Sequence, residues 1–235
     1  MTVESVLEQL AALGSEQTKK TLLRHGGPEN MYGVKVQDLK KVLKQTKQNH
    51  ALALEVYATG NSDAMYLAGL MADPKQMSPT DLQVWAEQAN WSMLSEYTVP
   101  WVAAESGHGL EMGVSWIDSD QALIASAGWS TLGSYVALQP DDQLNLALLE
   151  QLLERVKTSI HASPNRVRYT MNNFVIAVGC YVVPLHEKAQ EVAQAIGEVH
   201  VSMGDTACKV PEAVGYIQKV AGMGKIGQKR KTVRC

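Results

Sequence analysis

Apolar residues recur at helical spacing along almost the whole chain. In residues 3–13 they fall three and four positions apart, which places them on one face of a helix: Val3, Val6, Leu7, Leu10 and Leu13. Residues 36–46 repeat the pattern and fill the opposite face with lysines. The same spacing predicts helices over 50–59, 63–72, 80–89, 91–105, 120–137, 141–160, 165–180 and 186–197. The chain is therefore predicted to be all-α.

Serine and proline mark two of the expected helix starts. Ser78-Pro79 and Ser163-Pro164 each place a capping residue before a proline at the first helical position. Residues 139–142 end one helix and begin another, with acids at the positive end of the new helix. Only the run 174–183 is rich enough in β-branched residues for a strand, and its length suits a buried helix equally well.

Ten or more helices joined by short connections predict antiparallel helix pairs. A spacing of roughly 35–45 residues between comparable helices suits a HEAT-like stack, in which each pair buries one face against its neighbour. An irregular all-α bundle fits the apolar pattern as well as the stack does. Periodicity alone does not separate the two architectures.

Charge is segregated along the chain, although the net charge is only −3. Residues 19–47 carry a balance of +6, residues 48–154 a balance of −13, and residues 209–235 again +6. Local patches rather than the net value decide how a polyanion is attracted. Both ends of the chain could therefore hold phosphates, whereas the acidic middle would repel them and could instead face a protein partner.

Cysteine and histidine spacing indicates neither a metal site nor a disulfide framework. Cys180, Cys208 and Cys235 are odd in number and far apart, as expected for free thiols in a reducing cytoplasm. The first thirteen residues lack the basic start and apolar run of a signal peptide. Serines and glycines interrupt the uncharged segment 121–138, which favours a buried helix over a membrane span. We expect a cytoplasmic monomer with no cofactor and no membrane contact.

Three stretches resemble the bacterial DNA alkylation repair family, whose members are HEAT-like α-solenoid glycosylases that remove cationic alkylated purines. The stretches are MYGVKVQDLKKVLKQ (31–45), WSMLSEYTVPWVAAE (91–105) and SWIDSDQALIASAGW (115–129). The similarity runs over roughly 5–200, in the order that the family has. It favours the stack over the bundle and predicts one HEAT-like domain over 1–221, followed by a basic flexible tail over 222–235.

The resemblance also implies a reaction. In that family an aspartate before Val-Pro is thought to stabilise positive charge on the sugar as the purine leaves, and aromatic side chains line the cleft. An oxocarbenium-like transition state needs a nearby carboxylate, and a cationic base is attracted to an indole face. Aligned on Val99-Pro100, the acid is Glu96, which makes it the catalytic candidate.

The aromatic positions of the family are not matched at the same register. Ser92 stands four residues before Glu96, with Trp91 one place off, while a basic position reads Ser126 and a second tryptophan position reads Asn173. Trp91 and Trp129 remain the aromatic cleft candidates. On a regular helix the apolar residues of this segment share one face nearly opposite Glu96, which predicts that they belong to the core: Trp91, Leu94, Tyr97 and Trp101.

Cations and amides supply candidate DNA contacts. The helix start at 165–174 could grip a phosphate or a base edge, the loop 200–213 carries one lysine, and the tail has the density of a phosphate-binding arm. The candidates are Lys40, Lys44, Arg166, Arg168, Asn172, Asn173, Lys209, Lys225, Lys229, Arg230, Lys231 and Arg234. Buried amides that cap backbone, and a tail that only solubilises the chain, are the structural alternatives.

Two functions fit these observations. The first is a metal-free, monofunctional DNA glycosylase that acts on cationic alkylated purines, with Glu96 stabilising the transition state and duplex DNA as the expected substrate. The second is a non-catalytic HEAT-like scaffold that kept the stack and binds DNA structure or a protein partner. The residues at Ser92, Ser126 and Asn173 favour the second. The environment of Glu96 decides between them.

Overall fold

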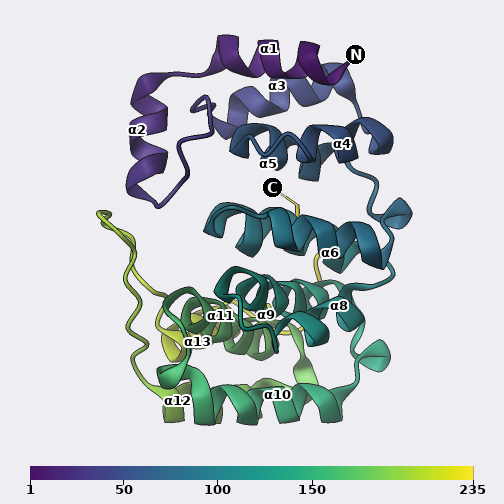
Figure 1. Ribbon diagram of the computed structural model, residues 1–235. Coiled ribbons are helices and arrows are strands. Elements are labelled where there is room, and N and C mark those ends of the chain that lie inside the picture. The colour runs from purple at the N-terminus through teal and green to yellow at the C-terminus, as the bar shows by residue number, and fades with distance from the viewer. Residues whose placement is uncertain (235) are drawn as a thin grey trace.

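The computed structural model describes residues 1–234, and within them the chain forms helices and loops without a strand (Figure 1). The all-α prediction is confirmed. The α-helices are α1 (Val3–Leu13), α2 (Glu16–Arg24), α3 (Val36–Thr46), α4 (His50–Tyr57), α5 (Ser62–Met71), α6 (Pro79–Gln88), α7 (Val99–Glu105), α8 (Gly109–Trp116), α9 (Ala122–Leu138), α10 (Leu146–Ser159), α11 (Asn165–Tyr181), α12 (His186–Ile196) and α13 (Ala213–Gly222).

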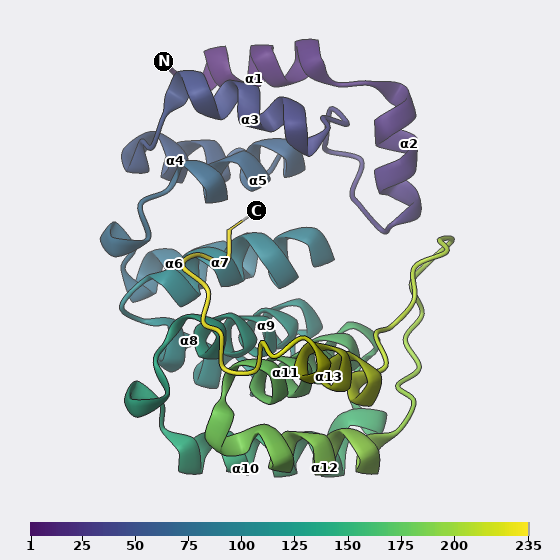
Figure 2. The ribbon, with the colours of Figure 1, turned by 180° about the vertical axis from the view of Figure 1, so that it is seen from behind.

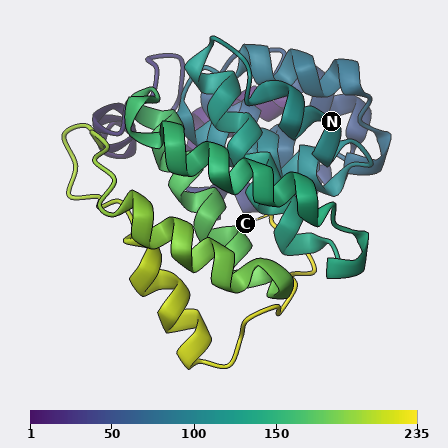
Figure 3. The same ribbon diagram turned by 90° about the horizontal axis from the view of Figure 1, so that it is seen from below.

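From α4 onward the helices form two layers (Figures 1 and 3). Helices α5, α7, α9, α11 and α13 pack on one another in chain order, and we call them the inner layer. The outer-layer helices α4, α6, α8 and α10 each pack on the inner helix that follows, and α12 packs on α11 and α13. Stacked helix pairs of this kind are the HEAT-like arrangement that the family resemblance predicted.

Side-chain caps start several helices where the sequence places them. Ser78 accepts the backbone N–H of Asp81, while the Asp81 carboxylate accepts the N–H of Ser78, so α6 begins with a capping box before Pro79. At the second predicted start, α11 begins one residue later than a serine cap would place it, with Pro164 in the capping position. The ambiguous run 174–183 belongs mostly to α11 and is helical.

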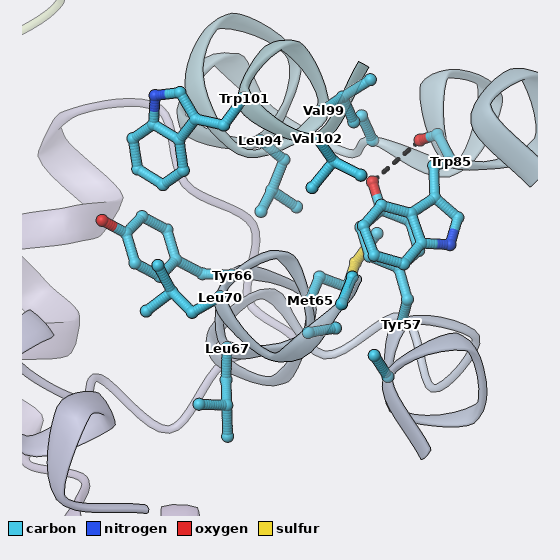
Figure 4. Close-up of a cluster of buried hydrophobic side chains, with 14 of the residues drawn as sticks. Tyr57, Met65, Tyr66, Leu67, Leu70, Trp85, Leu94, Val99, Trp101 and Val102 are labelled. Atoms are coloured by element: carbon cyan, nitrogen blue, oxygen red, sulfur yellow. Dashed lines mark hydrogen bonds between the residues drawn. The ribbon is translucent and has the colours of Figure 1, made fainter. Parts of the chain in front are cut away.

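Aromatic side chains fill the core between the N-terminal pairs. The rings of Tyr57 and Trp85 stack with centroids 4.0 Å apart and planes at 4° (Figure 4). The Tyr57 hydroxyl donates to the Trp85 carbonyl at 2.8 Å, which satisfies a phenol that is otherwise fully buried. Burial raises the pKa of Tyr57 far above its ordinary value. A second core joins α9, α10, α11 and α12.

Asp63 on α5 holds the segment 32–34. Its buried carboxylate accepts the backbone N–H groups of Tyr32, Gly33 and Val34 at 2.7, 2.9 and 3.1 Å. Gly33 has a φ of +78°, and a Cβ there would lie 2.5 Å from the backbone nitrogen of Lys19, so only glycine fits. The aromatic-Gly-Val motif that carries part of the family resemblance therefore has a structural role: it attaches the segment 32–34 to α5.

The chain after α13 turns back along the molecule and crosses the ends of the inner helices (Figure 2). We call residues 225–234 the C-terminal strap. The last carbonyl groups of a helix have no partner within it, and the strap donates to several of them. The Gly227 N–H bonds to the Cys180 carbonyl at the end of α11 at 2.9 Å, and the Arg230 N–H bonds to the Ala137 carbonyl in α9 at 2.8 Å.

Lysine and arginine side chains of the strap contribute to the same edge. The Lys229 ammonium donates to the Val136 carbonyl at 2.9 Å and pairs with Asp141 at 2.8 Å. Cations are favoured at helix C-termini, because the macrodipole places negative partial charge there. The basic composition of the strap therefore suits the edge that it covers.

Glu105, the last residue of α7, anchors the end of the strap. Its carboxylate accepts the Thr232 hydroxyl and the Val233 N–H, the latter at 2.9 Å, and pairs with the Arg234 Nε at 2.9 Å. Arg234 also donates to the carbonyl of Ala72 after α5, at 3.0 Å. The side chain of Val233 is buried in the N-terminal core.

The strap differs from the flexible arm that the sequence predicted over 222–235. Two cations of the tail, Lys229 and Arg234, bind helix carbonyls and carboxylates of the chain itself, so the tail is attached to the body at these points while other side chains of it stay exposed. Cys235 lies outside the described residues. Glycine and lysine content predicts a phosphate-binding arm, because local composition does not reveal partners such as Asp141 and Glu105 that lie far away in the sequence.

Replacing Asp63 by alanine is expected to destabilise the fold by about 2–4 kcal/mol, because three buried backbone N–H groups lose their acceptor. Urea unfolding followed by circular dichroism measures the change. The exposed Glu55 on α4 provides the control, and Glu55→Ala should stay within about 0.5 kcal/mol of wild type. Equal stability of the two variants would contradict the role of Asp63.

Glu105→Gln is expected to lower the free energy of unfolding by about 1–3 kcal/mol at neutral pH. Burial alone would raise the pKa of Glu105, but Thr232, Val233 and Arg234 hold it below its ordinary value. A carboxylate with a depressed folded pKa contributes stability above its unfolded pKa of about 4.3 and loses it as the pH falls through the folded value. The gap between wild type and Glu105→Gln should therefore close in urea titrations at progressively lower pH.

Candidate nucleic-acid interface

Glu96 lies in a π-helical turn, η2 (Leu94–Thr98), that runs directly into α7. The Val99 N–H donates to the Leu94 carbonyl five residues earlier, which is the π-type bond. Pro100 has no N–H to give to the Glu96 carbonyl, as an α-helix would require at this position. The wider turn therefore forms where proline interrupts the α-helical ladder.

The π turn changes which residues share a face. Leu94, Trp91 and Trp101 are buried, as the helical pattern predicted for core residues. Tyr97 is 39% exposed, so its assignment to the core is wrong. Glu96 does not turn to solvent: its side chain is only 1% exposed. A helical wheel at regular α-helical spacing misplaces side chains across a π turn, because that turn contains one extra residue.

The carboxylate of Glu96 is engaged by Arg166, the second residue of α11. The guanidinium donates from Nε to Oε1 at 2.7 Å and from Nη2 to Oε2, a bidentate pair between residues 70 positions apart. Burial raises the pKa of Glu96, and the charge and hydrogen bonds of Arg166 oppose that rise. Arg166 thus neutralises the charge that a cationic transition state would require.

Arg166 also binds the loop 197–212. Its Nη1 lies 3.3 Å from the Met203 sulfur, and its guanidinium carbon lies 4.5 Å from the centre of the Tyr169 ring. A cation over a tyrosine face is stabilised by the ring quadrupole. Arg166 therefore connects the π turn, the start of α11 and the loop, and it is not free to hold a phosphate as the sequence predicted.

A pocket of about 440 Å³ opens beside this pair, between α2, η2, α11 and the loop. Trp91, Tyr97 and Tyr169 line it together with Arg166 and Lys209. Trp91 thus remains a cleft candidate, five residues before Glu96 rather than four. Sequence reasoning missed Tyr169, although its position three residues after Arg166 on a helix is the signal that places them on one face.

Trp129, the other aromatic candidate, belongs to the core. It is 1% exposed and packs on Phe174 with ring centroids 5.2 Å apart. The guanidinium carbon of Arg155 lies 5.7 Å from its ring centre. Two smaller cavities border Trp129, but its buried ring offers little surface to a ligand.

The amides and the second arginine of α11 have separate surroundings. Asn172 is buried and donates to the Pro211 carbonyl at 2.9 Å, so it fixes the loop before α13. Asn173 is half-buried and faces cavities on the inner layer. Arg168 is half-buried, with a long contact of 3.5 Å to Asn165. Of these residues, Asn173 is the most accessible to a ligand.

The remaining cationic candidates form three separate groups. Lys40 and Lys44 lie on α3 near the N-terminal end of the stack, and Lys209 lies on the loop facing α2 (Figure 1). The lysines and arginines of the strap, whose backbone is seen in Figure 2, form the third group. Within it, Lys229 and Arg234 are ion-paired with the body, whereas the others are exposed: Lys225, Arg230 and Lys231.

The carboxylates of the inner layer are all engaged. Within the described bounds of its helices and η2 there are three, Asp63, Glu96 and Glu105, and each is bound by backbone N–H groups or by an arginine. Most other acids of 48–154 lie on the outer helices or the turns, among them Glu55, Asp81, Glu87, Glu111, Glu150 and Glu154. The acidic middle therefore does not obstruct the inner layer.

Several other features bear on cofactors and reactivity. Within residues 1–234, no group of three or more acidic, histidine or cysteine side chains is placed to hold a metal ion. Burial raises the pKa of the Cys180 thiol to about 11, while Cys208 is exposed. None of the helices formed by these residues has the length and apolar character to cross a membrane.

Comparisons with known proteins agree with this architecture. The family model described as DNA alkylation repair enzyme matches residues 6–217. The uncharacterized protein Lmo0209 of Listeria monocytogenes is 36% identical over 231 residues, covering 96% of this chain and 100% of its own length. Lin0241 of Listeria innocua, also uncharacterized, is 36% identical over 225 residues, covering 93% of this chain and 97% of its own.

A solved structure extends the likeness to three dimensions. It represents a family of proteins related to the HEAT-like repeat DNA glycosylases, with affinity for branched DNA structures. It is 41% identical to this chain, covers 100% of both chains and superposes with a TM-score of 0.91. The chain therefore belongs to the DNA alkylation repair family and has its HEAT-like repeat fold.

Proposed function

We propose that the protein binds branched DNA through its inner layer and does not excise bases. The observation that carries this proposal is the buried bidentate pair of Glu96 with Arg166. A carboxylate that stabilises a departing purine must face the sugar with its charge uncompensated. In this chain both carboxylate oxygens are taken, and the side chain is closed off from a ligand.

The distribution of charge supports a polyanionic ligand on the inner layer. Glu96 and Glu105 are paired with arginines, Asp63 is bound by backbone N–H groups, and the inner helices contribute the cations Arg168 and Lys219. Exposed cations lie at the α3 end, on the loop opposite α2, and along the strap. A branched ligand whose arms diverge can reach separated groups that one straight duplex would not reach together. The affinity of the related protein for branched DNA agrees with this arrangement.

The glycosylase alternative rests on the aromatic pocket beside Glu96. Trp91, Tyr97 and Tyr169 could receive an unstacked cationic base. For catalysis Arg166 would first have to leave Glu96, which exposes a buried charge without a partner at a cost of several kcal/mol. That cost favours the binding function over the excision function.

Excision is tested directly. Alkylated duplex DNA incubated with stoichiometric protein should release no free 7-methylguanine or 3-methyladenine, because the charge of Glu96 is already compensated. Chromatography of the released bases measures this, and a known alkylpurine glycosylase serves as the positive control. Release by wild type that Glu96→Gln abolishes would establish the glycosylase function and overturn the proposal.

Binding is tested with a four-way junction and a linear duplex of the same length and base composition. We expect tighter binding of the junction at each salt concentration. Arg24→Ala/Lys209→Ala should lower the slope of log affinity against log salt by about 2, because two exposed cations are removed where α2 meets the loop.

The exposed Lys75, which lies in the turn between α5 and α6, provides the matched control. Lys75→Ala should leave both affinity and slope unchanged. Equal affinity of wild type for junction and duplex, or a double variant that behaves as Lys75→Ala does, would contradict the proposed surface.

A further inference from the structure

A second cavity, separate from the pocket beside the Glu96 pair, is lined by α11, α13 and the C-terminal strap. Figure 2 shows the strap passing along these helices. Its volume is about 620 Å³, within the range of sites that enclose small molecules. Apolar side chains form one wall, from Ile176 and Ala177 of α11 and Val220 of α13. The rings of Tyr181 and Tyr216 border the same space. These surfaces suit a flat, largely apolar group.

The opposite wall is cationic and comes from one segment. Lys225, Lys229, Arg230 and Lys231 of the strap all line the cavity, and no carboxylate lines it. Asp141 neutralises Lys229 at 2.8 Å. The other three are exposed and make no ion pair within residues 1–234. An anion with several acceptor oxygens, such as a phosphate, matches such a group of donors.

Asn173 adds a polar group to this cavity. It is half-buried and lines the space, and its side-chain carboxamide has no hydrogen bond within residues 1–234. Its neighbour Asn172 differs, because the Pro211 carbonyl already takes its amide. A free carboxamide presents a donor and an acceptor side by side, which is the pattern that pairs with the edge of a nucleobase.

We propose that this cavity binds a nucleoside monophosphate unit, with its base between the tyrosines and the apolar wall and its phosphate on the strap cations. A fatty acid would leave the Asn173 amide unused, and inorganic phosphate would leave the apolar wall unused. The unit could be a free mononucleotide or the phosphorylated end of a DNA strand. The inference does not depend on branched-DNA binding, since the cavity is distinct from the Glu96 pocket.

The test is calorimetric titration of the full-length protein with the four deoxynucleoside 5′-monophosphates. We expect at least one to bind about tenfold more tightly than its nucleoside and than inorganic phosphate, because only the nucleotide engages both walls. Binding that is no tighter for the nucleotides than for the nucleosides or for phosphate alone would overturn the proposal. Failure of the junction assay would leave this result intact.

Two variants assign the binding to this cavity. Asn173→Ala should weaken nucleotide binding several-fold, through lost contacts to the base edge. Lys231→Ala should weaken nucleotide binding while leaving the weak nucleoside binding unchanged. Because the Lys231 side chain is exposed, its removal should not disturb the fold. Lys75→Ala is the control. Nucleotide binding unaffected by both Asn173→Ala and Lys231→Ala would place the ligand elsewhere and overturn the assignment.

The source of the nucleotide unit is separated by competition. A single-stranded oligonucleotide with a 5′-phosphate is compared with the same strand without it, each in the presence of the bound mononucleotide. Displacement by the phosphorylated strand alone would support a strand end as the natural occupant. Displacement by neither strand would support a free nucleotide, and both outcomes are consistent with the chemistry of the cavity.

Discussion

The C-terminal ends of the inner helices lie along one edge of the stack, and their unpaired carbonyl groups need hydrogen-bond donors. Every inner helix leaves carbonyl groups without intrahelical partners, and a stack brings those ends into one row. The strap donates hydrogen bonds to these carbonyl groups along its length, from Gly227 at the end of α11 to Arg234 after α5. In an unstructured tail a segment of this composition would be solvated. Here it bonds to the ends of α5, α7, α9 and α11, each of which packs only on its neighbours in the stack.

The carboxylates of the inner layer are bound by groups of the chain itself. The family resemblance made Glu96 the catalytic candidate, yet its partner Arg166 comes from α11 and binds both carboxylate oxygens. Asp63 and Glu105 follow the same logic, each bound by groups of the chain itself. The carboxylates of the inner layer are therefore engaged within the protein, and the proposed binding function rests on this property.

Local patterns in the sequence predicted the elements well and their long-range partners poorly. Apolar spacing placed most of the helices but predicted none at α2, α8 or α13. Ser78-Pro79 located the start of α6, because capping is decided within four residues. The pairing of Glu96 with Arg166 joins positions 70 residues apart, so spacing gave no access to it. Lysine density suggested an arm for nucleic acid, since composition reveals charge and does not reveal which surface receives it. The family resemblance supplied the stacking that periodicity left open.

The π turn before Pro100 has a consequence for how this chain is compared with its relatives. A π turn holds one residue more than an α-helical turn. Counting back from Val99-Pro100 without a gap therefore places a serine where an indole is expected, whereas an alignment that allows one inserted residue matches Trp91 instead. The offset of Trp91 from the expected aromatic position is therefore one of register.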